Sequence, residues 1–362
     1  MGGAAKLVDL NYSPPSGWTG PVFALSQDYP TQLPPATSFP WQTIDFKTLP
    51  KEYLQAVLDY CYEGSIDNSF VPQKNPVRKW FHAPWMHTGP NAREFVHGLT
   101  NERQSRPFEL SDMQNTAHNN AAVGFYNDVG GYTIGRVWAD PVHPDPTQAS
   151  FPEGAVSYKL LFTQAPAAKV PFLAGAPEWS ADVNRNPQRP STAAQVENKK
   201  VRLLQIDVAV KDRRADPAGG WVFGTFQYDD AVQDASPWRR VTPVGLAWGN
   251  DPTLTETQFN AGNAPAESWI PKSVSLVPGG NATEAERLQW FRNLQPGQAF
   301  TPGAQSLDFS LQLGVSIQNF AASITPPQDP SRRALLEAAP SAAPVKSFVE
   351  ELLKDNIDGA AE

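Results

Sequence analysis

Proline restricts the fold of this chain more than any other feature, because 36 of the 362 residues are proline and they are spread along the whole sequence. Proline lacks the backbone N–H that helices and sheets use, so it interrupts both and favours ordered turns. The composition is 40% hydrophobic and includes eleven tryptophans, which is enough apolar surface for a core and speaks against general disorder. Long, proline-rich connections between short strands therefore favour a β-rich fold over a helical one.

Extended segments dominate the middle of the chain. Five runs rich in β-branched and aromatic residues are bounded by Gly, Pro, Asp or Asn, and they cover residues 132–138, 155–163, 201–211, 221–228 and 241–248. Between residues 307 and 317, apolar and polar residues alternate with period two, which predicts a long strand with one buried face. We expect a mainly β fold, an antiparallel sandwich or distorted barrel with a few peripheral helices and long Pro-rich loops.

The remaining segments predict one β-rich domain with appendages. Helical spacing of apolar residues covers 50–62, and a capping box beginning at Thr283 opens a second helix that reaches about residue 294. The expected organisation is an N-terminal wrapping arm at 1–48, a single domain at 49–322, a Pro/Ala-rich linker at 323–343 and a C-terminal amphipathic helix at 344–358. We expect that last helix to dock on the body of the protein or on a partner.

The net charge is −8 and the basic residues are dispersed, which disfavours nucleic acid as a partner, because a phosphate-binding surface needs clustered Lys and Arg. The single cysteine, Cys61, excludes an intramolecular disulfide and a thiolate-rich metal site. No apolar run reaches the roughly 18 residues of a membrane span, and no signal peptide is recognisable. We expect no transmembrane segment and a cytoplasmic chain, or a secreted one if a leader has been removed.

All five histidines lie between His82 and His143, and three of them share one aromatic segment, Trp80 to His97. Histidine titrates near neutral pH and is the commonest neutral metal ligand. Spacings of five and ten residues between His82, His87 and His97 fit neither a helix face nor a strand face, so a loop would have to bring the rings together. Three interpretations remain open for these residues: rings hydrogen-bonded within aromatic packing, catalytic proton transfer or substrate contact, and a divalent transition-metal site.

Two arginines flank His97 in the sequence, Arg93 and Arg103, and each neighbours a glutamate. The planar guanidinium suits a carboxylate or phosphate, so both arginines are candidates for binding an anionic substrate group. Internal Arg–Glu pairing is the alternative. Trp85, in the same segment, is a candidate aromatic contact for a substrate.

Polar residues alternate along three of the predicted strands, and residues two apart on a strand share a face. This spacing groups Glu153, Ser157 and Lys159, then Gln205, Asp207 and Lys211, and then Thr225, Gln227 and Asp229. If these faces coincide, they form a polar wall on one side of the sheet. Such a wall is a solvent-facing sheet surface or, with Lys159 beside Asp207, a site for acid/base chemistry or sugar binding to which Glu153 and Gln205 add contacts.

Several blocks together resemble a poorly characterised, largely bacterial family of cytochrome c-related proteins. They are Arg78–Met86, Arg93–Thr100, Phe151–Gly154, Gly220–Phe226 and Trp290–Leu294. The resemblance implies a shared body over most of residues 40–320 and, in some members, a c-type haem. This chain departs from it at the haem motif, which needs Cys-x-x-Cys-His. Cys61 stands alone, and residues 253–289, where the motif would fall, contain neither Cys nor His. A covalent haem is therefore excluded.

The function predicted from these features is an enzyme that acts on a small organic or glycan substrate by histidine-based acid/base chemistry, with or without a metal. The predicted catalytic residues are His82, His87, His97, Lys159 and Asp207. One alternative is a non-catalytic module that binds a glycan or a hydrophobic ligand. The other is a haem-less relative of a c-type cytochrome-linked redox protein.

Overall fold

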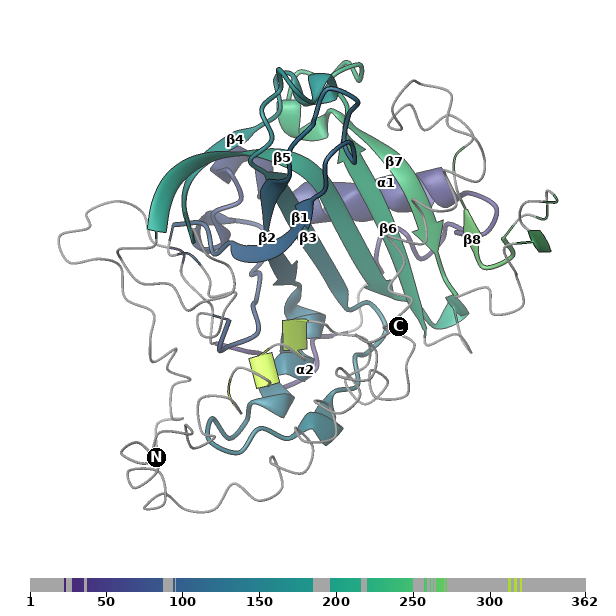
Figure 1. The fold of residues 1–362 in the computed structure, drawn as a ribbon. Coiled ribbons are helices and arrows are strands. Elements are labelled where there is room, and N and C mark those ends of the chain that lie inside the picture. Colours follow the sequence, from purple (N-terminus) through teal and green to yellow (C-terminus); the bar gives the residue numbers. More distant parts are fainter. Residues whose placement is uncertain are drawn as a thin grey trace.

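The described part of the protein is built around one antiparallel sheet (Figure 1). The computed structural model describes residues 23, 28–35, 38–86, 94, 96–184, 196–215, 220–249, 257–258, 261, 263, 265–269, 271, 312–313, 316–317 and 320. The strands are β1 (Thr100–Ser105), β2 (His118–Tyr126), β3 (Val156–Thr163), β4 (Glu178–Asn184), β5 (Val196–Lys211), β6 (Trp221–Tyr228), β7 (Val241–Ala247) and β8 (Ser268–Trp269).

The strand order is β1-β2-β3-β5-β6-β7-β8, and β4 pairs with the first part of β5. All the pairings are antiparallel, so the expected mainly β, antiparallel fold is confirmed. Within the described residues the strands belong to a single sheet that does not close into a barrel.

In the described part of the chain, two α-helices accompany the sheet, α1 (Pro50–Tyr62) and α2 (Asp128–Val137). Six short 3-10 turns are also described: Ile66–Asn68, Pro72–Lys74, Pro146–Gln148, Pro171–Leu173, Arg213–Ala215 and Pro237–Arg239. Four of these six begin with proline, at the position where a missing N–H and a fixed φ are harmless. The scattered prolines thus shape the connections between the strands, as the sequence predicts.

α1 packs its apolar side against one face of the sheet (Figure 1). Leu54, Val57 and Cys61 are fully buried there. Gly224 on β6 permits this close approach, because a Cβ at that position would lie 2.1 Å from Leu54 Cδ2. Trp41 and Phe46, which precede the helix, are buried in the same cluster. This face therefore carries the main core.

α2 lies against the opposite face of the sheet, where it forms a second apolar cluster. Tyr126, Ala209 and Phe223 point to this face because they alternate with residues of the main core along their strands. Ile134 and Val137 of α2 pack there. The cluster covers one end of this face and leaves the other end to polar residues.

The predicted strand at 132–138 is wrong, since these residues belong mostly to α2. Asn127 caps the helix, with its side chain accepting a hydrogen bond from Gly130 N at 3.0 Å. Val129, Thr133, Ile134 and Val137 are buried at helical spacing. A short run of β-branched residues fits the period of a helix as well as that of a strand, and here the Asn127 cap decides in favour of the helix.

The strand predicted at 307–317 is also wrong where the structure describes it, because residues 312–313 and 316–317 have helical backbone. Leu313, Ile317 and Phe320 are buried in the second cluster at spacings of four and three. The helix predicted from 283, the linker at 323–343 and the C-terminal helix at 344–358 lie outside the described residues.

Candidate functional site

A row of cross-strand neighbours brings the predicted polar faces together. Gly124 on β2 is opposite Lys159 on β3, which is opposite Asp207 on β5, and Asp207 is opposite Thr225 on β6. The row continues to Gly245 on β7. The strand register therefore brings the central residues of the predicted polar wall together, with Lys159 and Asp207 in the middle of the sheet.

Asp207 is held by three side chains. Its Oδ2 lies 3.0 Å from Lys159 Nζ. Its Oδ1 accepts hydrogen bonds from Gln205 Nε2 at 2.6 Å and from Thr225 Oγ1 at 2.8 Å. These contacts fix the carboxylate and leave Lys159 two further N–H donors.

Lys159 remains partly accessible, because its side chain is 37% exposed and that of Asp207 is 27% exposed. Burial lowers the pKa of Lys159, but attraction to Asp207 and Glu102 raises it by more, so that the pKa lies above its ordinary value of 10.5. The Lys159 amine is thus protonated at neutral pH, and the resulting ammonium acts as a hydrogen-bond donor.

Gln227 completes the group on this face. It is directly opposite Gln205 in the register of β5 and β6, and it is 1% exposed. Its Oε1 is buried and has no hydrogen-bond partner. We call Lys159, Gln205, Asp207, Thr225 and Gln227 the polar centre.

Other residues of the predicted polar faces lie outside the polar centre. Glu153 precedes β3 and accepts a hydrogen bond from Arg213 N at 2.6 Å. Lys211 lies 5.4 Å from the centroid of the Trp221 ring, and Asp229 accepts a hydrogen bond from Ala231 N at 3.0 Å in the turn after β6. Glu153 and Asp229 lie beyond the ends of β3 and β6, and Lys211 is the last residue of β5, so alternation does not bring these three residues to the centre of the sheet.

The described histidines of the aromatic segment occupy packed positions. His82 is 3% exposed, with Phe23 and Phe125 edge-on to its ring at 4.9 and 5.2 Å. Its Nδ1 lies 3.2 Å from Gln312 Nε2.

His97 stacks on Trp179 at 4.4 Å, and its Nδ1 lies 3.5 Å from Glu94 Oε1. His87 lies outside the described residues. Among the residues that are described, no three His, Cys, Asp or Glu side chains gather as a metal site would require. The catalytic and metal-binding roles of these histidines stay predictions.

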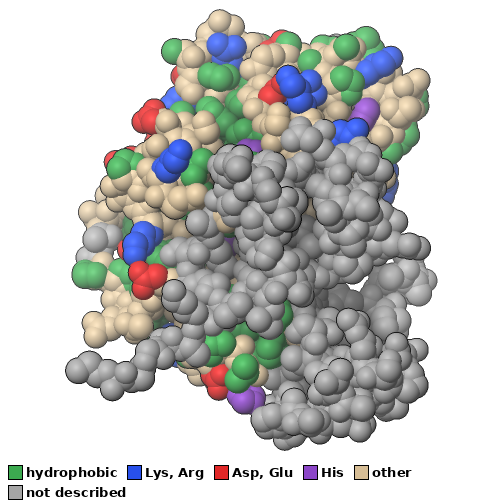
Figure 2. All heavy atoms as spheres, turned by 90° about the vertical axis from the view of Figure 1, so that its left-hand side faces the viewer, with side chains coloured by type: hydrophobic (Ala, Val, Ile, Leu, Met, Phe, Trp, Pro, Cys, Tyr) green, Lys and Arg blue, Asp and Glu red, His purple; other side chains and the backbone are tan. Residues whose placement is uncertain are grey.

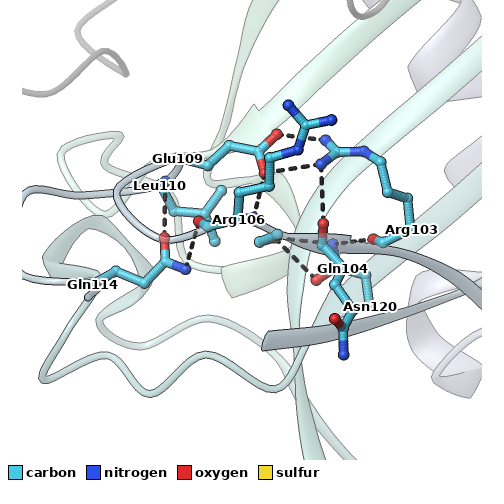
Figure 3. Close-up of polar contacts among 8 residues, drawn as sticks. Arg103, Gln104, Arg106, Glu109, Leu110, Gln114 and Asn120 are labelled. Atoms are coloured by element: carbon cyan, nitrogen blue, oxygen red, sulfur yellow. Dashed lines mark hydrogen bonds and ion pairs between the residues drawn. The ribbon is translucent and has the colours of Figure 1, made fainter. Parts of the chain in front are cut away.

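Arg103 makes the internal pairing that the sequence analysis gave as the alternative to substrate binding (Figure 3). It forms two hydrogen bonds with the Glu109 carboxylate, one of them 3.0 Å long from Nη1 to Oε2. Arg93 lies outside the described residues. Trp85 is 7% exposed and packs edge-on against Phe320 at 5.3 Å. Anion binding by Arg103 and substrate contact by Trp85 stay predictions.

Two residues of the polar centre, Thr225 and Gln227, are absent from the predicted site although they lie on the predicted faces. Their alternation with buried residues was the available signal. What singles them out is the strand register, which places them beside Asp207 and Gln205. Glu102, which acts on the charge of Lys159, lies on β1, a strand that the sequence pattern does not predict.

On the face shown in Figure 2, basic and acidic side chains are interspersed over the described part. No described helix combines the length and the apolar character needed to cross a membrane.

The chain matches no family model, no curated protein and no solved structure. The resemblance to cytochrome c-related proteins accordingly stays a prediction.

Proposed function

We propose that the protein is a binding module for a small polar ligand, and that the polar centre is its binding site. The observation that carries the proposal is the network in which Lys159, Gln205 and Thr225 all contact one partly exposed aspartate, Asp207. All five residues of the polar centre lie next to main-core residues along their strands, so rigid backbone holds them in place. A preorganised set of donors and acceptors is what ligand recognition requires.

Binding is better supported than acid/base catalysis at this centre. A catalytic lysine needs a pKa lowered toward the working pH, whereas the pKa of Lys159 is raised. Asp207 already accepts two hydrogen bonds and forms an ion pair, so both of its oxygens are held by fixed partners. The packed positions of His82 and His97 likewise favour a structural use of those rings.

The proposal is tested by saturation-transfer NMR of the full chain with a panel of small molecules in three charge classes: neutral polyols, carboxylates and amines. We expect at least one class to bind the wild type, and we expect Lys159→Met and Asp207→Asn to abolish that binding. Lys200→Met is the matched control, because Lys200 makes an exposed ion pair with Glu178 on the same sheet at 3.2 Å.

The control variant should bind as the wild type does. Equal loss in Lys200→Met and Lys159→Met, or no binding by any member of the panel, would refute the proposal. Circular dichroism and melting temperature establish that each variant is folded.

A further inference from the structure

We infer that the ligand of the polar centre is a neutral, hydroxyl-rich molecule such as a monosaccharide or cyclic polyol, and that Gln227 Oε1 accepts a hydrogen bond from one of its hydroxyls. This inference rests on the proposed function, because it names the ligand class of the same site.

The charges around the polar centre disfavour ionic ligands. Lys159 is already paired with Asp207, and Glu102 is close enough to act on the charge of Lys159. One ammonium and two carboxylates leave no surplus positive charge for a carboxylate or phosphate ligand. The two carboxylates would attract an amine, but the amine would lie beside the Lys159 ammonium that already pairs with Asp207, and this proximity is repulsive. A neutral ligand meets neither penalty.

The hydrogen-bonding groups of the polar centre match hydroxyls. Lys159 offers donors, whereas Asp207 and Gln227 offer acceptor oxygens. A hydroxyl group both donates and accepts, so one hydroxyl can bridge a donor and an acceptor at neighbouring positions of the sheet. Phe223 lies two residues before Thr225 on the same strand face and is only partly buried, which places an aromatic surface next to the polar groups.

The unpartnered Gln227 Oε1 is the strongest single indication that the ligand carries hydroxyl groups. A buried acceptor without a donor is unfavourable, and most such atoms in proteins have a partner. Gln114, in the connection between β1 and β2, shows what a satisfied buried glutamine looks like (Figure 3). Its Oε1 accepts from Leu110 N at 3.0 Å, and its Nε2 donates to Arg106 O and Thr116 O at 2.9 and 2.7 Å. Gln227 Oε1 lacks such a donor, and a ligand hydroxyl supplies one once the side chains that shield this buried atom move aside.

The experiment compares Gln227→Met with Gln114→Met in the full chain, by titrating glucose, galactose and inositol and by measuring the melting temperature. Gln227→Met should weaken polyol binding about fivefold or more while raising the melting temperature, because it removes an unsatisfied buried acceptor. Gln114→Met should lower the melting temperature and leave binding unchanged. This opposite pair of shifts is the signature of a ligand-directed glutamine.

A second measurement keeps the inference open to refutation if Gln227→Met does not fold: deoxy analogues of the best-binding sugar are titrated into the wild type, and removal of one hydroxyl should weaken binding by the same factor. Polyol binding that is insensitive to both changes overturns the role of Gln227. Binding of only carboxylates or amines, lost in Lys159→Met, overturns the ligand class but preserves the proposed function. No binding by any probe overturns both.

Discussion

Asp207 within β5 and Asp212 just after it are both paired with basic side chains, yet their surroundings differ. Asp212 is 1% exposed, and Arg214 donates to it from Nε at 2.9 Å and from Nη2 at 2.5 Å. Tyr53 on α1 donates to the same carboxylate at 3.1 Å, and Arg214 also binds Ile44 O at 2.8 Å. This network joins α1, the preceding segment and the end of β5.

The two acid–base pairs occupy different environments. At Asp212 a planar guanidinium and a phenol close the carboxylate off from water, which suits a structural contact. At Asp207 the partner is a lysine with N–H donors to spare, and both side chains remain partly exposed. The first network is shielded from water and links separate parts of the fold, whereas the second keeps the partial exposure that the proposed binding role requires.

The largest expected effect comes from opening the Asp212 network. Arg214→Ala removes the guanidinium and leaves the buried carboxylate with hydrogen bonds from Tyr53 Oη and the backbone N–H of residue 214, so the free energy of unfolding should fall by about 3 kcal/mol. Urea denaturation of wild type and variant measures the change. A loss below about 1 kcal/mol would mean that the Asp212 network contributes no more to the free energy of unfolding than a partly exposed ion pair does.

The second effect is the acid dependence of stability. Burial raises the pKa of Asp212, but hydrogen bonds from Arg214 lower it by more, so the pKa lies below its ordinary value of 3.8. A depressed carboxyl pKa stabilises the fold above the unfolded-state value, and that contribution is lost as the pH falls through the folded-state value. The stability difference between wild type and Asp212→Asn should therefore be constant at about pH 5 to 7 and shrink below about pH 4. Denaturant titrations at several pH values check this, and a constant difference down to about pH 2 would contradict it.

Much of the sheet could be predicted from the sequence, because alternation and flanking turn residues mark β3, β5, β6 and β7. α2 could not, since its short apolar run fits both the helical and the strand period and the Asn127 cap decides. The helical residues around 313 could not either, because their alternation favours a strand, whereas Leu313, Ile317 and Phe320 pack at helical spacing in the second cluster. The faces that carry Lys159 and Asp207 follow from alternation alone. Their direct opposition does not, because it depends on strand register and on the irregularity in the β3–β5 pairing at Leu161 and Phe162.

The third prediction concerns Lys159→Met, which should change the free energy of unfolding little and ligand binding strongly. Lys159→Met removes a partly exposed ion pair, so the free energy of unfolding should change by less than about 1 kcal/mol. Binding of the ligand identified by NMR should be lost, because the variant removes the donors. A loss of stability as large as that of Arg214→Ala would show that the Lys159–Asp207 pair is structural as well.

The smallest change in stability is expected for Lys159→Arg, which isolates the difference between the two basic residues. An arginine at this position can still pair with Asp207, so the free energy of unfolding should stay within about 0.5 kcal/mol of the wild type. Ligand binding should nevertheless weaken, because a guanidinium directs its donors in one plane toward the carboxylate and takes up more of the exposed face. Calorimetric titration with the same ligand measures this. If Lys159→Arg binds as tightly as the wild type, positive charge alone is sufficient, and the contrast with the Arg214 network lies in exposure and not in the choice of lysine.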